Sequence, residues 1–570
     1  MSRKESSSAD VWDVVVVGAG AGGLTAASVA AADGCRVLLL EQAEVVGGTT
    51  AISGGMMWIP GNHKAAAAPR PDTIDAARTY LKQTAPGADR ERLEAFLARG
   101  DEALRDLEAR TSLRVQPVLT YPDYYPDLPG ATAGGRVLEP VPFDAAELGR
   151  AFRLVRDPLP EFMLFGGMMI SRADIPHLRR VGKSLRSALH VGRLVFRYGL
   201  QRLRARRGMT LYLGNALVGR LLKSALDLGV TIRTRVSVDA LVADAQGRVA
   251  ALDVSDASGR RSRISARRGV VLATGGISHD AELRRDYVPD SAGSLTATVS
   301  PGKAPRGARL AASLGGKLSG PTQEGAFWVP ASTFTRRDGS RGVYPHTVTD
   351  RAKPGLIAVD SSGRRFVNEA VSYHEFVRAQ LSHANSAIPA WLICDRRFLW
   401  KYGLGKIKPF TLSVRADIAA GYLKRADTLA GLARLIGVPT AAFEQTVTGF
   451  NEHAKYGEDP AFGRGSNIYQ RSLGDADRKP NPCVAPLTDA PFYAVAVQPA
   501  DLGMSAGIVT DAQARVLAND GRPIGGLYAC GNDMASIMEG AYPGPGITLG
   551  PALTFGWIAG RHVAAEPVQS

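Results

Sequence analysis

Residues 13–41 read DVVVVGAGAGGLTAASVAAADGCRVLLLE, a pattern in which two apolar runs flank a glycine-rich turn. The valine run predicts a buried strand, the small residues after it predict a turn and a helix, and CRVLLLE predicts a second strand. A strand, a crossover helix and a parallel strand form a βαβ unit. The stretch therefore predicts a dinucleotide-binding α/β domain.

Three glycines of the turn each meet a physical requirement. Gly18 makes the tight turn, Gly20 lets the backbone approach a pyrophosphate at the helix N-terminus, and Gly23 lets helix and strand pack closely. The second strand ends at Glu41, 18 positions past Gly23. A carboxylate there accepts hydrogen bonds from ribose hydroxyls and repels a 2′-phosphate. The pattern disfavours NADP and leaves NAD and FAD open.

Three further segments resemble flavoproteins of the succinate dehydrogenase/fumarate reductase superfamily. They read GGTTAISGG at 47–55, ATGG at 273–276 and GLYACGND at 526–533. In that superfamily the first lies along the flavin and pyrophosphate, the second is a strand-to-glycine turn, and the third runs beside the ribityl chain. The resemblance implies FAD, and the lack of histidine in the first segment predicts that FAD is bound non-covalently.

The resemblance also implies which residues contact the cofactor. They come from these segments and their neighbours, and are Gly18, Gly20, Gly23, Glu41, Gly48, Thr49, Thr50, Ser53, Gly54, Gly55, Val236, Ala273, Thr274, Gly275, Asn532, Asp533 and Leu549.

The order of these segments predicts the domain organisation. Residues 1–290 and 503–570 carry the FAD signals, whereas residues 291–502 carry none. We therefore expect an α/β fold in which a split Rossmann-like FAD-binding domain is interrupted by an inserted α+β catalytic domain. The active site should lie between the two, over the flavin.

Composition is typical of a soluble globular protein. The 570 residues exceed one ordinary core, and 45% of them are hydrophobic and 22% charged. The four cysteines are far apart and form no metal-binding cluster, so no metal is expected. The start, MSRKESSSADVWD, lacks the apolar stretch of a secretory signal, and no apolar run is long enough to span a membrane. We expect a cytoplasmic location.

A basic insert at about residues 150–208 accounts for most of the net charge of +15. Residues 149–208 contain 14 arginines and lysines against three acidic residues, so the charge is concentrated there and does not indicate nucleic acid binding. Within 177–208, apolar residues recur near helical spacing between arginines. Two interpretations stay open: peripheral attachment to the inner face of the cell membrane, or an ordinary amphipathic helix with a solvated basic face.

Residues 365–369 read RFVNE, a motif of fumarate reductases. In those enzymes the proton-donating arginine stands four residues past the glutamate of the motif, and here that position is Tyr373. The difference disfavours fumarate reduction and succinate oxidation.

Three tyrosine-containing segments narrow the resemblance to the 3-ketosteroid 1-dehydrogenases, over nearly the whole chain. They read PDYY at 122–125, SYHEF at 372–376 and YPGPG at 542–546. Their presence around one FAD scaffold implies a steroid-degrading oxidoreductase that acts on a CH–CH bond.

The mechanism of that family, carried over to this chain, uses four residues. The Tyr542 hydroxyl and the Gly546 N–H hold the 3-keto oxygen, Tyr373 removes the C2 proton, and Tyr124 lowers the cost of phenolate character at Tyr373. Hydride then leaves C1 for flavin N5. Tyrosine has an ordinary pKa of about 10 and is a poor base at neutral pH, so His374 remains a second candidate base.

Several alternatives stay open at this point. A 4(5α)-dehydrogenase would remove hydrogens from a different bond of the same ring, another relative would act on a carboxylate, and a non-catalytic flavoprotein would sense redox state or bind lipid. The sequence leaves undetermined the steroid side chain, the oligomeric state, and whether a quinone or another acceptor takes the electrons.

Overall fold

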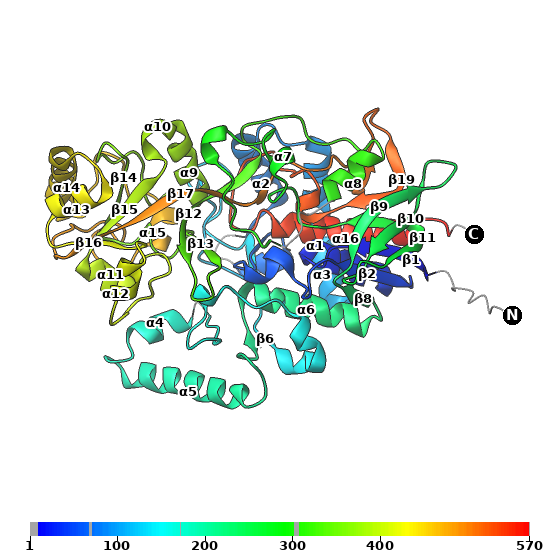
Figure 1. Ribbon diagram of the computed structural model, residues 1–570, viewed down its shortest axis with the longest axis horizontal. Helices are drawn as coiled ribbons and strands as arrows, with labels where there is room; N and C mark the ends of the chain where they lie inside the picture. The colour runs from blue at the N-terminus through cyan, green and yellow to red at the C-terminus, as the bar shows by residue number, and fades with distance from the viewer. Residues whose placement is uncertain (1–9, 68–70, 172, 301–306, 569–570) are drawn as a thin grey trace.

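The computed structural model describes residues 10–67, 71–171, 173–300 and 307–568, and its larger sheet has eight strands (Figure 1). The main path of this sheet runs β18-β19-β11-β1-β2-β8, with β10 and then β9 attached beside β11. From β19 to β8 the neighbouring strands are parallel. The eight strands are β1 (Asp10–Val17), β2 (Val37–Glu41), β8 (Thr231–Thr234), β9 (Ser237–Ala243), β10 (Val249–Ser255), β11 (Arg261–Leu272), β18 (Arg515–Leu517) and β19 (Pro523–Ala529).

The valine run forms the middle of this sheet. Val14, Val15 and Val16 are completely buried in β1, which pairs in parallel with β2 on one side and β11 on the other. A central parallel strand is covered on both faces, and this explains its uninterrupted apolar sequence. Helix α1 (Ala21–Ala32) joins β1 to β2. The predicted βαβ unit is confirmed.

The C-terminal helix packs against the first helix of the chain. Helix α16 (Leu549–Ala565) contacts α1 along its length. A Cβ atom on Gly556 would lie 2.7 Å from the Gly22 carbonyl oxygen, and one on Gly560 would lie 2.7 Å from the Ala26 carbonyl oxygen. Only glycine permits this approach, so the last segment of the chain completes the layer that begins at residue 10.

The second sheet has six strands and lies beside the first, toward the left of Figure 1. Its path runs β13-β12-β17-β15-β14, β16 also pairs with β17, and every ladder is antiparallel. Its strands are β12 (Ala326–Thr335), β13 (Arg341–Pro345), β14 (Leu356–Val359), β15 (Ala390–Asp395), β16 (Lys424–Ala426) and β17 (Phe492–Met504).

The chain therefore leaves the parallel sheet, builds an antiparallel one, and returns. This confirms the expected fold class, a split Rossmann-like domain with an α+β insertion. We propose boundaries near residues 290 and 502. The larger helices elsewhere are α2 (Ile74–Thr84), α3 (Arg90–Arg110), α6 (Leu213–Asp227), α9 (Tyr373–Ser382), α11 (Arg396–Tyr402), α13 (Leu429–Ile436), α14 (Thr440–Ala454) and α15 (Ile468–Leu473).

The described part of the basic insert contains two α-helices, which lie at one edge of the molecule. Helix α4 (Asp174–Arg179) is followed by α5 (Leu185–Arg202), which runs along the lower edge in Figure 1. In the part of the chain that the structure describes, no helix has the length and apolar character needed to cross a bilayer. Those residues also contain no group of histidine, cysteine and acidic side chains that could hold a metal ion.

The RFVNE motif forms a buried ion network inside the second domain. Arg365 donates two hydrogen bonds to Glu369, at 2.7 and 2.8 Å, and also pairs with Asp459 at 2.7 Å. Arg464 donates to the same Glu369 carboxylate at 3.1 Å. Burial alone would raise the pKa of Glu369, but the two guanidinium groups outweigh it and hold that pKa below its ordinary value. In this chain the motif supports the fold.

The variant Glu369→Gln should unfold more easily. It leaves two buried guanidinium groups without their shared carboxylate, and we expect the free energy of unfolding at pH 7 to fall by about 3 kcal/mol. Because the folded pKa of Glu369 is lowered, its contribution is present above about pH 4.3 and is lost as pH falls further.

Urea unfolding of the FAD-loaded chain measures both effects. The exposed Glu282, which pairs with Arg309, gives a control: Glu282→Gln should cost less than about 1 kcal/mol. Equal losses in the two variants would show that burial of the network is unimportant.

Candidate active site

A cavity of about 1030 Å³ joins the glycine-rich segments to the tyrosines. It is walled by the carboxyl ends of the parallel strands, by the basic insert and by loops of the second domain. The crevice at the carboxyl ends of parallel strands is the usual ligand position in folds of this type. The predicted cofactor residues in its wall are Gly18, Gly20, Glu41, Gly48, Thr49, Thr50, Ser53, Gly54, Gly55, Val236, Ala273, Thr274, Gly275, Asn532 and Leu549.

The glycines of this wall fit a bound dinucleotide. Gly48, Gly54 and Gly275 have nothing within 4 Å of the position that a Cβ atom would take, so the backbone itself faces the open cavity. Gly18 differs, because a Cβ atom there would lie 2.2 Å from the Ala273 carbonyl oxygen. Gly48, Gly54 and Gly275 therefore leave room for a ligand, whereas Gly18 makes the tight turn. The residues present fit FAD.

Glu41 lies at the end of β2, as the sequence predicts for a ribose-binding carboxylate. It accepts hydrogen bonds from the N–H groups of Ala19, at 2.9 Å, and Ala43, at 2.8 Å. Burial raises the pKa of Glu41, against these two hydrogen bonds and the nearby Arg156. Arg156 belongs to the insert and also lines the cavity, and no motif marked it in the sequence.

Two of the predicted cofactor residues lie outside the cavity wall. Gly23 faces the turn, where a Cβ atom would lie 1.9 Å from the Gly18 carbonyl oxygen, so it serves the close packing of helix on strand. Asp533 is buried and accepts hydrogen bonds from the Thr274 hydroxyl, at 2.8 Å, and the Gly276 N–H, at 2.9 Å. It braces the second glycine turn from behind and does not face the cavity.

The predicted catalytic tyrosines meet at one place on the cavity wall. The Tyr373 hydroxyl donates a hydrogen bond of 2.7 Å to the Tyr542 hydroxyl, although 169 positions separate them. The Tyr124 ring stacks on Tyr542 with a centroid distance of 5.5 Å and meets Tyr373 edge-on at 5.7 Å. Tyr124, Tyr373, Tyr542 and Gly546 all line the cavity.

Backbone contacts hold the YPGPG loop in place. The Pro543 carbonyl accepts hydrogen bonds from the Tyr80 hydroxyl, at 2.6 Å, and the Tyr124 N–H, at 3.0 Å. Gly546 has φ +95°, which favours glycine, and its carbonyl accepts from the Trp58 N–H at 3.0 Å. Its own N–H has no acceptor among the described residues. A free donor next to Tyr542 is what an oxyanion site requires.

A buried polar group supports this loop from behind, and no pattern in the sequence predicted it. The Trp58 indole N–H donates to Asp123 at 2.8 Å, and Asp123 pairs with Arg136 at 2.7 Å. A Cβ atom on Gly544 would lie 2.6 Å from the indole nitrogen. Asp123 directly precedes Tyr124, so one carboxylate ties the loop to the PDYY segment. The position of Asp123 inside the PDYY segment was the one sequence feature that could have indicated this role.

Burial raises the pKa of both Tyr373 and Tyr542. The Tyr124 hydroxyl makes no hydrogen bond with a described group, but it lies close to Tyr373 and opposes this increase in the pKa of Tyr373. His374 lies outside the cavity wall, and its Nδ1 accepts from the Trp328 N–H at 3.2 Å. Burial lowers the pKa of His374 to about 3, which leaves it a very weak base. The geometry thus favours Tyr373 over His374.

Comparison with known proteins identifies the scaffold. Residues 13–549 match the family described as FAD binding domain. The chain belongs to this flavoprotein family. The match spans nearly the whole chain, so FAD is the cofactor for which the glycine-rich half of the cavity is built.

Several similar proteins are named as dehydrogenases. The flavoprotein is 39% identical to the 4-oxocyclohex-2-ene-1-carboxylate 5-dehydrogenase of Sinomonas cyclohexanicum, over 97% of this chain and 93% of that one. It is 34% identical to a 3-oxosteroid 1-dehydrogenase of Mycobacterium tuberculosis, over 97% and 98%. Among solved structures, the 3-ketosteroid delta1-dehydrogenase of Sterolibacterium denitrificans, in complex with 1,4-androstadiene-3,17-dione, has a TM-score of 0.90 at 37% identity, covering 98% of this chain and 100% of that one.

The flavoprotein is therefore an FAD-dependent oxidoreductase. It is an FAD-dependent dehydrogenase related to the 3-oxosteroid 1-dehydrogenases.

Proposed function

We propose that this dehydrogenase creates the 1,2 double bond of 3-oxosteroids. The observation that carries the proposal is the 2.7 Å contact between the Tyr373 and Tyr542 hydroxyls on the cavity wall. In a ketone, the oxygen and the α-carbon are both bonded to the carbonyl carbon. Groups that act on both atoms must therefore lie close together, and these two hydroxyls do.

The oxygen of the ketone binds between Tyr542 and Gly546 in this proposal. The Tyr542 hydroxyl and the free Gly546 N–H donate to it and stabilise the negative charge that develops when C2 loses a proton. Both donors belong to one loop with little freedom to reorganise, and fixed donors of this kind stabilise a transition state effectively.

A proton relay explains how Tyr373 can accept the C2 proton although its phenol is a weak base. Because its pKa is raised, the phenol is neutral at pH 7 and already donates its proton toward Tyr542. We assign three linked transfers: the C2 proton moves to Tyr373, the Tyr373 proton to Tyr542, and the Tyr542 proton to the ketone oxygen. Both tyrosines stay neutral and the substrate becomes its enol.

FAD, when bound, would supply a hydride acceptor for C1, and a quinone or another acceptor would then take up the electrons. When the ketone re-forms, Tyr542 takes the proton back from the oxygen, and one proton leaves the relay for solvent. The substrate loses one hydride and one proton in total.

The relay makes a specific prediction for pH dependence. Phenolate formation at Tyr373 would make the rate of flavin reduction rise about tenfold per pH unit below its raised pKa. The relay needs no free phenolate, so the rate should stay level from about pH 6 to pH 9. Anaerobic stopped-flow measurements of flavin reduction by a 3-oxosteroid distinguish the relay from phenolate formation. A rate that rises steadily with pH would contradict the relay.

A second candidate substrate is a monocyclic 4-oxocyclohexanecarboxylate, which the relative with 39% identity favours. The ring ketone would bind at the same tyrosines, and the carboxylate would need a cation such as Lys408, which lines the cavity. The other wall residues beyond the tyrosines include Val118, Phe162 and Met169. This apolar wall suits a steroid ring system better than a carboxylate.

The rate at which each ketone reduces the FAD-loaded enzyme under anaerobic conditions tests the substrate class. We expect androst-4-ene-3,17-dione to bleach the flavin, with an apparent second-order rate constant at least about tenfold above that for 4-oxocyclohexanecarboxylate. The reverse ratio would assign the smaller ketone. Bleaching by neither would contradict the proposed reaction class.

A further inference from the structure

The basic insert concentrates exposed apolar side chains. Among the described residues, 19 large apolar side chains are exposed, and ten of them lie between residues 157 and 208. Isolated exposed apolar residues are normal on a protein surface, whereas a contiguous group marks a site of interaction. The concentration of exposed apolar side chains on the insert therefore indicates a site of interaction.

Helix α5 presents an apolar stripe to solvent. Its members recur at spacings of four, seven, four and three residues, which places them on one face of the helix. They are Leu185, Leu189, Phe196 and Leu200 on the helix and Leu203 directly after it, and each residue is between 51% and 83% exposed.

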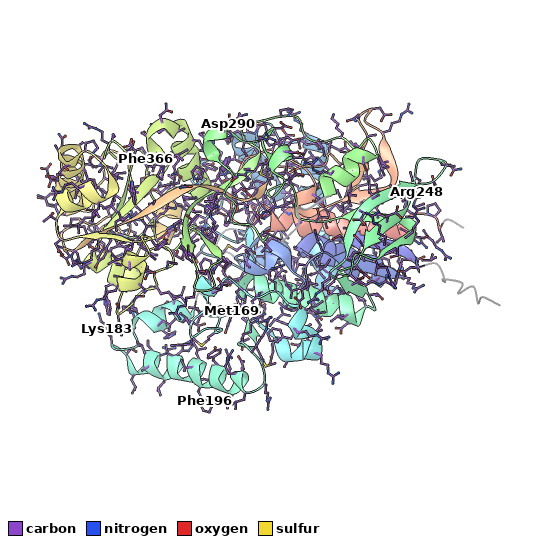
Figure 2. All side chains as sticks on the ribbon, viewed as in Figure 1. Met169, Lys183, Phe196, Arg248, Asp290 and Phe366 are labelled. Atoms are coloured by element: carbon purple, nitrogen blue, oxygen red, sulfur yellow. The ribbon has the colours of Figure 1, made fainter. Side chains whose placement is uncertain are left out.

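The opposite side of α5 contacts the protein. Ser187 and Tyr198 are buried there, and the Tyr198 hydroxyl donates to the Phe165 carbonyl at 2.9 Å. Figure 2 shows Phe196 on the outer side of the helix, away from the rest of the molecule. An amphipathic helix packed on a protein normally turns its polar face outward. Here the outward face is apolar, so packing within this chain does not account for it.

Positive charge flanks the stripe. Residues 177–208 contain ten arginines and lysines and no acidic residue. Arg186 and Arg193 lie beside the stripe on the same helix, and neither has an ion-pair partner among the described residues. An apolar stripe bordered by unpaired arginines is complementary to an anionic lipid surface, where apolar side chains enter the acyl boundary and arginines meet headgroups.

Part of the cavity entrance lies on the same insert. Phe162, Ile175 and Phe410 each line the cavity and are also partly exposed, so they mark its entrance. Phe162 and Ile175 belong to the insert. Phe410 lies two residues after Lys408, whose ammonium group donates to the Met163 carbonyl and ties this loop to the insert. The insert thus carries both the apolar stripe and part of the cavity entrance.

We propose that the outer face of α5 docks on an anionic lipid bilayer and holds the cavity entrance against it. Attachment is peripheral and reversible, because the surface lies along one helix and no described helix can span a membrane. The benefit for catalysis rests on the proposed function: steroid ketones and quinones both partition into bilayers. Docking itself does not depend on which ketone is the substrate.

Vesicle sedimentation of the full FAD-loaded chain tests the proposal without any substrate. We expect binding to vesicles of phosphatidylcholine with phosphatidylglycerol, and at least about tenfold weaker binding to pure phosphatidylcholine or in 1 M salt. The double variant Leu189→Glu/Phe196→Glu should lose at least tenfold in partitioning to the anionic vesicles.

Matched controls use exposed apolar residues of the second domain. Leu435→Glu/Tyr456→Glu should bind the vesicles like the wild type, because these side chains lie on α13 and just after α14. Flavin reduction by a dissolved ketone should be unchanged in the Leu189→Glu/Phe196→Glu variant, which separates docking from catalysis.

Two results would overturn the proposal. One is a wild-type chain that fails to bind anionic vesicles at low salt. The other is a dimer in solution that dissociates in the Leu189→Glu/Phe196→Glu variant while vesicle binding is absent, because the α5 face would then be an interface between two copies of the chain.

Discussion

Replacing Tyr373 by phenylalanine should slow flavin reduction by a 3-oxosteroid about a thousandfold while FAD remains bound. The hydroxyl is the group that receives the C2 proton in the proposed relay, and a positioned general base contributes roughly 10²–10⁴-fold to a rate. The ring would stay packed against Tyr124 and Tyr542, so the fold should be unaffected. Anaerobic stopped-flow absorbance gives the rate, and the visible flavin spectrum gives the FAD content.

A matched control lies in the same group of aromatic rings. Tyr469 packs at a centroid distance of 4.9 Å from Tyr124, but it is absent from the cavity wall and its buried hydroxyl has no hydrogen-bond partner among the described residues. Tyr469→Phe should change the rate less than about threefold. If Tyr373→Phe and Tyr469→Phe behaved alike, Tyr373 would have only a packing role.

Replacing Tyr542 by phenylalanine should lower the same rate by roughly 10²–10³-fold. The variant removes one of the two donors to the ketone oxygen, and loss of one oxyanion donor has about this effect. The Gly546 N–H would remain, so activity should fall but not vanish. Because the missing donor acts mainly in the transition state, we expect the rate constant at saturation to fall more than the apparent affinity for the steroid.

A combined variant tests whether the two tyrosines act as a unit. If Tyr373 and Tyr542 share one relay, Tyr373→Phe/Tyr542→Phe should be little slower than the slower single variant. Multiplication of the two single effects would instead indicate independent roles, and this would contradict the relay.

The FAD-binding half of the molecule could be predicted from sequence because its requirements are local. Gly18 and Gly55 both have positive φ and stand where a Cβ atom would meet backbone atoms within 2.6 Å, so other residues are excluded. The strand before the turn is an uninterrupted valine run because a central parallel strand is buried on both faces. Asp533 shows the limit: its segment was identified, but which way its carboxylate faces depends on the Thr274 turn, 259 positions away.

The contact between the two tyrosines required the folded chain. Resemblance supplied the identities of Tyr373 and Tyr542, whereas their 2.7 Å contact depends on how α9 meets the C-terminal loop. The Trp58–Asp123–Arg136 support was missed for the same reason, since its members join only in the folded chain.

Helix α5 shows a different limit of sequence analysis. The spacing of its leucines predicted an amphipathic helix but left open which side would face the protein. The structure shows that the Tyr198 side packs inward and that the Leu189 side faces solvent. Pattern alone could not distinguish these arrangements, because both sides carry apolar residues.

The product of a single anaerobic turnover with 5α-androstane-3,17-dione, whose ring A is saturated on both sides of the ketone, tests the proposed reaction most directly. We expect stoichiometric flavin reduction and a product with a double bond between C1 and C2. A product with a double bond between C4 and C5, or a flavin that stays oxidised, would contradict it.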